Sequence, residues 1–300
     1  MKLLKFAAID IGSNAVRLLF TNVIEDEKKT SFRKSSLIRI PLRLGEDSFN
    51  TGVISEKKIK KLSQTMMAFK YLMEVQEVVA FRACATSAMR EAENGKDVVT
   101  RVKNETGIEI EIIEGKEEAE IIYSNQIVEM IDDLNPYLYV DVGGGSTEIS
   151  LFADKKRVAT QSFDVGTIRI LSNKIGKKDF QVMKKWVKDL DFKGKEVKLI
   201  GSGGNINKIF KISGIKDNQP LLYSNLADIH KFISFYSIEE RIKILGMNPD
   251  RADVIIPASE IFLKIMKWSD ANQVIVPTIG VSDGIVHQLY KEYSRQKKEL

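Results

Sequence analysis

Two short segments combine an aspartate, glycine and hydroxyl or amide side chains in a pattern suited to binding phosphate. They read DIGSN at residues 10–14 and DVGGGSTE at residues 141–148. Glycine lets backbone N–H groups approach phosphate oxygens without a Cβ atom in the way, while Ser13 and Asn14 supply side-chain donors and Asp10 can hold a metal ion or a water. An ordinary hairpin also explains the first segment, but three consecutive glycines in the second are costly unless a ligand must come close.

Two further segments supply an arginine and a cluster of carboxylates. In ATSAMREAENG at 85–95, Thr86 or Ser87 can cap a helix whose N-terminus would attract an anion together with Arg90. EGKEEAE at 114–120 begins another predicted helix with four carboxylates, one of which could deprotonate a water for in-line attack on phosphorus. Plain capping, and the favourable placement of acids in a first helical turn, are the alternatives that these segments leave open.

Carboxylates must carry any acid or base chemistry, because the two histidines stand in unsuitable surroundings. His230 and His287 lie in helical patterns, and neither has a Ser or Cys nucleophile with an orienting acid close by in the sequence. Asp141 and Glu148 are suited to holding Mg²⁺, which would neutralise phosphoryl oxygens. The glycine cluster GSGG at 201–204 ends a predicted strand and opens a helix, so it is another candidate anion site. The GxxxxGK[ST] loop and a GxGxxG turn after a strand do not occur.

Secondary-structure elements must position these residues. The first are two apolar, partly β-branched runs, Leu4 to Asp10 and Ala15 to Val23, which predict a hairpin around the first turn. The pattern then predicts strands at 31–40, 78–83 and 108–113 and helices at 55–75, near Ala88 and from about Lys116. Strands at 137–142 and 148–152 flank the second turn, and Asp141 follows Asp10 by 131 residues. We therefore expect two related domains.

From residue 166 the periodicity becomes mainly helical, with short strands between the helices. The predicted elements are helices at 166–174, 179–188, 205–212, 226–236 and 253–268 and strands at 197–200 and 273–276. This mixed order predicts α/β layers, with a ligand crevice between the domains at the ends of the strands. The lysine-rich stretches at 174–188 and 291–298 indicate solvated helix faces in preference to a polyanion groove.

Composition is that of a globular intracellular protein. The 300 residues, 43% of them apolar, can bury a substantial core and fit two domains of roughly 150 residues each. The formal charge of +5 is compatible with a polyanionic ligand but far short of a nucleic-acid-binding arm. The single cysteine, Cys84, excludes an internal disulfide, and neither an export signal nor a membrane span is predicted. We expect a cytoplasmic protein without nucleic-acid or membrane partners.

Seven segments, taken together and in order, resemble the exopolyphosphatase / guanosine pentaphosphate phosphohydrolase family over about residues 6 to 285. They are AAIDIGSNAVRLL, PLRLGEDSFNTGVIS, ATSAMREAENG, IIEGKEEAE, YVDVGGGSTEIS, GSGGNINKI and RADVIIPA. The resemblance implies an α/β fold of two ribonuclease-H-like domains of the actin, sugar-kinase and Hsp70 superfold around a central cleft. We expect the first domain at 1–122 plus 286–300 and the second at 123–285.

The family's functional residues fall on matching positions of this sequence. Its catalytic base corresponds to Glu118, with Arg90 in the catalytic set, and its metal-binding acids correspond to Asp141 and Glu148. The matching phosphate contacts are Ser13, Asn14, Arg43, Gly144, Gly145, Ser146 and Thr147. The resemblance implies Mg²⁺, or another divalent cation, as the cofactor.

The activity that the resemblance implies is release of terminal orthophosphate from inorganic polyphosphate, by a water that a glutamate activates with the assistance of Mg²⁺. The alternative is removal of the 5′ γ-phosphate of pppGpp to give ppGpp. A small-molecule kinase and a non-catalytic phosphate or alarmone sensor of the same superfold are weaker candidates. Glu118, Asp141 and Glu148 argue against a sensor, because a pure binder gains nothing from burying extra negative charge beside phosphate. A homodimer is an expectation from the resemblance alone.

Two segments depart from the family's pattern. Its GGT reads Gly203, Gly204, Asn205 here, and its GLRxG reads GVSDG at 280–284, which removes an arginine. Longer relatives also carry extra helical domains that extend a basic channel for long chains. We therefore expect action on short polyphosphate or on a nucleotide in preference to processive work on very long polyphosphate.

Overall fold

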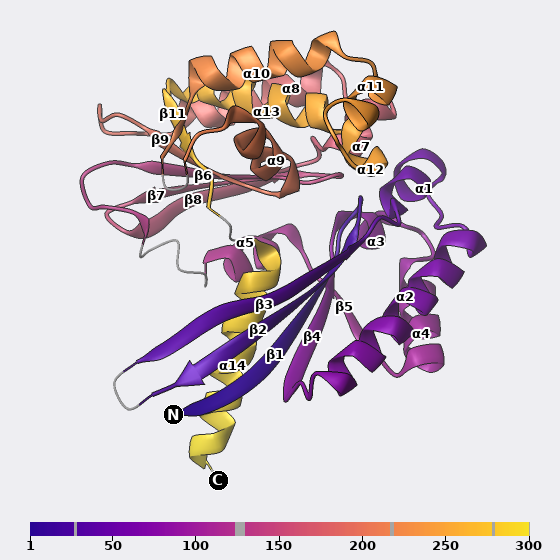
Figure 1. Cartoon of the computed structure of the whole chain (residues 1–300). Coiled ribbons are helices and arrows are strands. Elements are labelled where there is room, and N and C mark those ends of the chain that lie inside the picture. The colour runs from indigo at the N-terminus through magenta and orange to yellow at the C-terminus, as the bar shows by residue number, and fades with distance from the viewer. Residues whose placement is uncertain (27–28, 124–129, 217–218, 278–279, 300) are drawn as a thin grey trace. The chain divides into compact units, whose positions relative to one another are not determined.

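The computed structural model describes residues 1–26, 29–123, 130–216, 219–277 and 280–299, and the chain forms two compact units (Figure 1). The first unit comprises Met1–Asn125 and Gly280–Leu300, and the second comprises Gln126–Ile279. The chain thus leaves the first unit once and returns to it at its C-terminal end.

The first unit is built on a five-stranded mixed sheet in the order β3-β2-β1-β4-β5. Its strands are β1 (Lys2–Ile11), β2 (Val16–Glu25), β3 (Thr30–Ile40), β4 (Ala80–Ala85) and β5 (Ile110–Ile112). The first three strands are antiparallel, whereas β4 runs parallel to both β1 and β5. From Phe6 to Ile11 every residue of β1 is buried, as expected of a central strand, while β3, at the edge of the sheet, has no buried residue.

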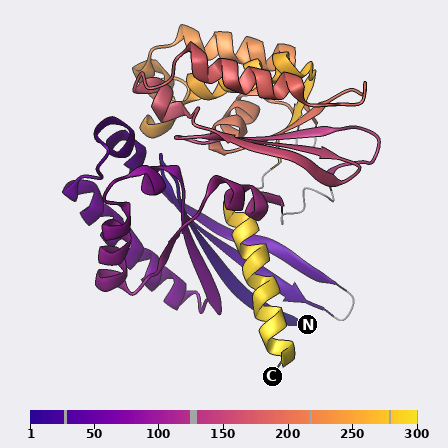
Figure 2. The ribbon, with the colours of Figure 1, turned by 180° about the vertical axis from the view of Figure 1, so that it is seen from behind.

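Among the described residues, six helices complete the first unit. They are α1 (Leu44–Thr51), α2 (Glu56–Val75), α3 (Ser87–Glu91), α4 (Gly95–Thr106), α5 (Gly115–Tyr123) and α14 (Val281–Glu299). Helix α2 buries Ile59, Leu62, Met66, Phe69 and Met73, whose spacing of three or four residues forms one apolar stripe. Helix α14 packs against β1, β2 and β4, and it lies across the face of the first sheet seen in Figure 2.

The second unit has a six-stranded sheet in the order β10-β11-β9-β6-β7-β8. Its strands are β6 (Tyr137–Val142), β7 (Thr147–Ala153), β8 (Lys156–Phe163), β9 (Lys198–Ser202), β10 (Leu221–Leu222) and β11 (Gln273–Ile275). Its helices are α7 (Thr167–Leu171), α8 (Lys177–Asp189), α9 (Gly204–Ser213), α10 (Tyr223–Phe235), α11 (Ile238–Lys243), α12 (Pro249–Ala252) and α13 (Ile255–Ser269). Helix α13 packs against α8, α9 and α10, and its Phe262 and Ile265 are fully buried in the core.

The two sheets repeat one topology. Each has three antiparallel strands in reverse chain order followed by two parallel strands, β3-β2-β1-β4-β5 in the first unit and β8-β7-β6-β9-β11 in the second, where β10 is an addition. This is the strand order of a ribonuclease-H-like domain. The predicted α/β fold class and the predicted internal repeat are therefore confirmed, and both candidate phosphate turns join the first strand of a unit to the second.

Candidate active site

The first candidate turn joins β1 to β2 in the first unit. The amide of Gly12 donates to the carbonyl oxygen of Ala15 at 3.1 Å, which closes the turn. Ser13 is buried, and its hydroxyl lies 2.9 Å from that of Ser87 in the first turn of α3, so the two share a hydrogen bond. The turn at 10–14 and the helix cap at 86–87, which the sequence marks as separate anion sites, thus lie side by side.

The segment that leads into α1 is bound to the same turn. The carbonyl oxygen of Asn14 accepts a 2.9 Å hydrogen bond from the amide of Arg43, and that of Ser13 accepts one of 2.9 Å from the amide of Gly45. Glycine is required at position 45, because a Cβ atom there would lie 2.9 Å from the Cβ atom of Ser13 and 2.6 Å from the ring of Phe49. The structure therefore brings together three of the predicted phosphate contacts, Ser13, Asn14 and Arg43.

Arg90 contacts the two residues that directly precede α5 in the first unit. The guanidinium of Arg90 donates from Nη1 to the carbonyl oxygen of Ile113 at 2.9 Å, and its Nε lies 4.0 Å from Oε2 of Glu114. The carbonyl oxygen of Glu114 accepts the amide of Glu118, one helical turn further on. Glu118 is 8% exposed, so the candidate base is a buried carboxylate one helical turn after Glu114, the acid that Arg90 contacts.

The glutamate beside the candidate base has a structural partner. Arg82 on β4 lies 2.9 Å from Oε1 of Glu117, and it also binds Glu111 at 2.6 Å and Gln288 of α14 at 2.9 Å. The hydrogen bond to Glu111 is the largest cause of the raised pKa of Arg82. Arg82 therefore ties β4, β5, α5 and α14 together and holds Glu117, the acid directly before Glu118.

Close packing against α14 fixes α5 a second time. A Cβ atom on Gly284 would lie closer than 3.0 Å to the carbonyl oxygen and carbonyl carbon of Ile121, the residue three positions after Glu118. Only glycine permits α14 to approach the backbone of α5 so closely. The glycine that ends the departing segment GVSDG thus has a packing role beside the candidate base.

The second candidate turn joins β6 to β7 and carries two acids. Asp141 and Glu148 are paired directly across these antiparallel strands. Asp141 is half-buried and accepts a 3.2 Å hydrogen bond from the hydroxyl of Ser202, while Glu148 is 4% exposed and accepts one of 3.0 Å from the hydroxyl of Ser162. Each carboxylate therefore has one oriented oxygen, and the two acids face the same region of the sheet.

Residues of helix α7 donate hydrogen bonds to the carbonyl oxygens of the glycine loop that lies between these acids. The carbonyl oxygens of Gly143 and Gly144 accept the amides of Thr167 and Ile168, at 3.1 and 2.8 Å, and the carbonyl oxygen of Gly145 accepts Nε of Arg169 at 2.6 Å. Since the C=O and N–H groups of a peptide point in opposite directions, the N–H groups of Gly144, Gly145 and Ser146 face away from α7. The predicted contacts Gly144, Gly145 and Ser146 thus form an amide-lined turn, and the hydroxyl of Thr147 donates to the carbonyl oxygen of Val165 at 2.5 Å.

The third glycine segment packs against Asp141. Gly203 has φ +104°, a conformation that favours glycine, and a Cβ atom there would lie 3.1 Å from Oδ1 of Asp141. The next carbonyl, that of Gly204, accepts a hydrogen bond from Arg251 of α12. Asn205, which replaces the family's threonine, stands in the first turn of α9. The segment GSGGN therefore borders the acid pair of the same unit.

The donor set of this unit fits Mg²⁺. Carboxylate oxygens are the ligands that Mg²⁺ prefers, and the ion is commonly held by one or two carboxylates while waters and substrate phosphates complete its octahedron. Asp141 and Glu148 provide two such groups. Within the described residues there is no group of three or more His, Cys, Asp or Glu that could hold a metal ion.

A comparison with protein families matches residues 23–293 of the chain to the Ppx/GppA phosphatase family. The chain belongs to this family. The predicted resemblance is therefore confirmed over most of the chain.

Among Ppx/GppA relatives, the bifunctional 3-dehydroquinate synthase/phosphatase of Fusobacterium nucleatum is 29% identical over 296 residues, which cover 90% of this chain and 44% of that protein. The chain thus spans less than half the length of this relative. Exopolyphosphatase 1 of Mycobacterium tuberculosis is 24% identical over 304 residues, covering 94% of this chain and 87% of the relative.

Solved structures show the same fold. An exopolyphosphatase from Cytophaga hutchinsonii aligns with a TM-score of 0.83 at 23% identity, covering 96% of this chain and 98% of the other. The Aquifex aeolicus member of the Ppx/GppA family aligns with a TM-score of 0.76 at 24% identity, covering 97% and 99%. At these identities the likeness extends to the fold alone.

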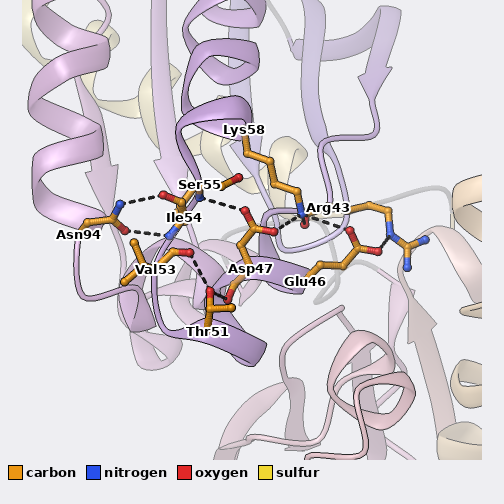
Figure 3. A network of polar contacts seen from close by, with 9 residues as sticks. All are labelled: Arg43, Glu46, Asp47, Thr51, Val53, Ile54, Ser55, Lys58 and Asn94. Atoms are coloured by element: carbon orange, nitrogen blue, oxygen red, sulfur yellow. Dashed lines mark hydrogen bonds and ion pairs between the residues drawn. The ribbon is translucent and has the colours of Figure 1, made fainter.

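Several residues that bind candidate site residues cannot be found from the sequence. Ser162 binds Glu148 from β8, a strand that the sequence does not mark, and Arg169 holds the glycine loop from α7. Lys58 of α2 binds the carbonyl oxygen of Arg43 (Figure 3). The register of the sheet and the turn of the helix bring each of these residues to its partner within its own unit, and a motif of neighbouring residues contains no signal for them.

One histidine has a neighbour that the sequence does not predict. Nδ1 of His230 lies 2.7 Å from the hydroxyl of Ser259, which itself donates to the carbonyl oxygen of Ile256 at 2.8 Å. Ser259 is fully buried, and burial lowers the pKa of His230. Because this serine is enclosed in the core and its hydroxyl donates to the backbone, the pair belongs to the packing. None of the described helices is long and apolar enough to cross a membrane.

Proposed function

We propose that the protein is an exopolyphosphatase, a phosphoric anhydride hydrolase that releases terminal orthophosphate from inorganic polyphosphate. The observation that carries the proposal is the acid pair Asp141 and Glu148, which flanks a glycine loop bound by its carbonyls to α7. Phosphoryl transfer needs this combination of amide donors and metal-binding acids. Membership of the Ppx/GppA phosphatase family supports it, as does the likeness to a relative named exopolyphosphatase.

In this proposal Glu118 is the general base. Its carboxylate would accept a proton from the attacking water, because a buried acid near phosphate is well placed for proton transfer when held within hydrogen-bond reach. Arg82 and the contact of Gly284 with Ile121 would keep α5 in place while Glu118 acts. Arg90 would stabilise negative charge on the phosphoryl oxygens through its guanidinium.

Asp141 and Glu148 would hold a divalent cation such as Mg²⁺, which when bound neutralises charge on phosphoryl oxygens. The amides of Gly144, Gly145 and Ser146 would donate to phosphate oxygens, and Thr147 would fix the end of the loop. Ser13, Asn14 and Arg43 would bind further phosphates through the first turn. The likeness to relatives named exopolyphosphatase is why polyphosphate is the substrate that we favour over pppGpp.

Phosphate release from tripolyphosphate, long-chain polyphosphate and pppGpp, measured side by side with Mg²⁺, tests the proposal. We expect Glu118→Gln to lower release by about 10²- to 10⁴-fold while binding is retained, because only proton transfer is lost. Glu120→Gln removes the same charge from an exposed position of the same helix and is the matched control. Faster release from pppGpp would make the protein an alarmone phosphatase, and no release from any substrate would overturn the proposal.

A further inference from the structure

Lys58, near the start of α2, lies where three segments of the first unit meet (Figure 3). Its Nζ atom is 2.5 Å from the carbonyl oxygen of Arg43, 2.8 Å from Oδ1 of Asp47 and 3.1 Å from Oε2 of Glu46. An ammonium group has three N–H donors, and these three acceptors match that number. The Lys58 side chain is 16% exposed, so its charge is largely withdrawn from water and bound to these partners.

The backbone of Arg43 explains why such a support is needed. Arg43 precedes α1 with φ 51° and ψ 46°, a left-handed conformation that costs a residue other than glycine free energy. Its amide donates to the carbonyl oxygen of Asn14 in the first turn, and its own carbonyl oxygen accepts Nζ of Lys58. The strained residue is therefore held on one side by the phosphate turn and on the other by Lys58. Such strain persists only where the surroundings enforce it, and it is frequent at ligand-binding positions.

Charge gives Lys58 a second effect on Arg43. Nε of Arg43 lies 2.5 Å from Oε1 of Glu46, so Glu46 divides its two oxygens between Arg43 and Lys58. In Figure 3 the terminal nitrogens of the Arg43 guanidinium point away from Glu46 and Lys58. Without Lys58, the charges of Glu46 and Asp47 would bear on Arg43 alone and would repel an approaching anion. With it, the two acids and the two cations balance.

Asp47 keeps the lysine in place. Burial alone would raise the pKa of Asp47, but the hydrogen bonds from Lys58 and from the amide of Ser55 outweigh burial and hold the pKa below its ordinary value. The carboxylate therefore stays ionised at neutral pH. It binds Lys58 through Oδ1 and the Ser55 amide through Oδ2, so α1 and the start of α2 are joined at the lysine.

A purely structural role for Lys58 is the rival explanation, and the rest of the network bears on it. The connection between α1 and α2 has its own anchors, because Asn94 both accepts the amide of Ile54 and donates to its carbonyl oxygen, at 3.0 and 2.9 Å. The hydroxyl of Thr51 also donates to the carbonyl oxygen of Val53 at 3.0 Å (Figure 3). These bonds hold the connection independently of Lys58, whereas the carbonyl oxygen of Arg43 accepts Nζ of Lys58 in addition to the amide of Glu46.

We propose that Lys58 is a positioning residue that holds Arg43, and balances Glu46 and Asp47, for binding an anionic, phosphate-bearing substrate. This inference rests on the proposed function and extends it to a residue that contacts no substrate. Lys58 thus affects the affinity for the substrate by holding Arg43 in position.

The test compares Lys58→Met with Lys57→Met in steady-state hydrolysis of tripolyphosphate. The side chain of Lys57 is exposed and makes no hydrogen bond or ion pair with any residue that the structure describes, so its replacement removes the same charge from the neighbouring position. For Lys58→Met we expect KM to rise on the order of tenfold with kcat within about twofold, because a charge-assisted contact that orients a binding group is lost. Lys57→Met should leave both constants unchanged. Lys58→Arg should have a KM between those of the wild type and Lys58→Met.

A double-mutant cycle with Arg43→Ala distinguishes positioning from a general effect. If Lys58 acts through Arg43, Lys58→Met adds nothing to the KM of Arg43→Ala. Additive effects, or a KM for Lys58→Met equal to that of Lys57→Met, would overturn the inference while wild-type hydrolysis still upheld the proposed function. Should Lys58→Met fail to fold, Lys58→Gln, which keeps a donor, enters the same cycle. If the wild type hydrolyses no phosphate chain, the proposed function fails, and the cycle is repeated on calorimetric binding of tripolyphosphate, where additive losses would again overturn the inference.

Discussion

Asp10 and Arg17 form an ion pair directly across β1 and β2, with 2.6 Å between Oδ2 of Asp10 and Nη1 of Arg17. The equivalent pair across β6 and β7 is Asp141 and Glu148. The equivalence follows from two turns of equal length, each closed by a hydrogen bond from the amide of its first residue to the carbonyl oxygen of its fourth. One copy of the turn is therefore flanked by an aspartate and an arginine whose charges neutralise each other. The other copy is flanked by two carboxylates.

This difference predicts that a divalent cation binds to the second copy. Titration with Mn²⁺, a probe for the Mg²⁺ site, followed by calorimetry should show that Asp141→Asn weakens binding by about tenfold or more, because a carboxylate ligand is lost. Asp10→Asn is the matched control and should leave the Mn²⁺ affinity within about twofold, since Arg17 already balances Asp10. Equal losses in the two variants would rule out the assignment of the metal to Asp141 and Glu148.

The paired turns could be predicted from the sequence because their signals are local. Glycine and polar residues between two apolar runs indicate a hairpin, and the same arrangement appears at both Asp10 and Asp141. Helix α2 could be predicted as well, because Ile59, Leu62 and Met66 repeat at helical spacing. The fold class and its internal repeat follow from such patterns together with the resemblance to a family.

The supporting residues could not be predicted because their partners are distant in the sequence. Lys57 and Lys58 are neighbours in the stretch EKKIKK, and only the packing of α2 shows that Lys58 turns inward while Lys57 stays exposed. Strand β8 lies at the edge of its sheet with mixed exposure, so it lacks a clear alternation of apolar residues, and its Ser162 was not expected to reach Glu148.

Gly166 is expected to be indispensable for the glycine loop. A Cβ atom there would lie closer than 3.0 Å to backbone atoms of Gly144 and Gly145, and a backbone cannot yield as a flexible side chain can. Gly166→Ala should therefore lower the free energy of unfolding by about 1–3 kcal/mol and strongly reduce phosphate release. Gly176→Ala is the control, because a Cβ atom there meets nothing closer than 3.8 Å. Thermal unfolding and phosphate release measured on both variants decide the matter, and similar behaviour of the two would show that the loop tolerates displacement.

Cys84 should make stability depend on pH in the alkaline range. Burial raises the pKa of its thiol to about 12, although Arg82 acts in the opposite direction. The unfolded chain has an ordinary thiol pKa of about 8.5, so above that pH the unfolded state binds fewer protons than the folded state, and the stabilising contribution of the thiol falls by about 1.4 kcal/mol per pH unit. Cys84→Ala cannot titrate in this way. Urea denaturation gives the free energy of unfolding of the wild type and of Cys84→Ala. Between pH 7.5 and pH 10, the wild type should lose about 2 kcal/mol more of this free energy than the variant. A constant difference would contradict the prediction, because it would show that the thiol has the same pKa in the folded and the unfolded chain.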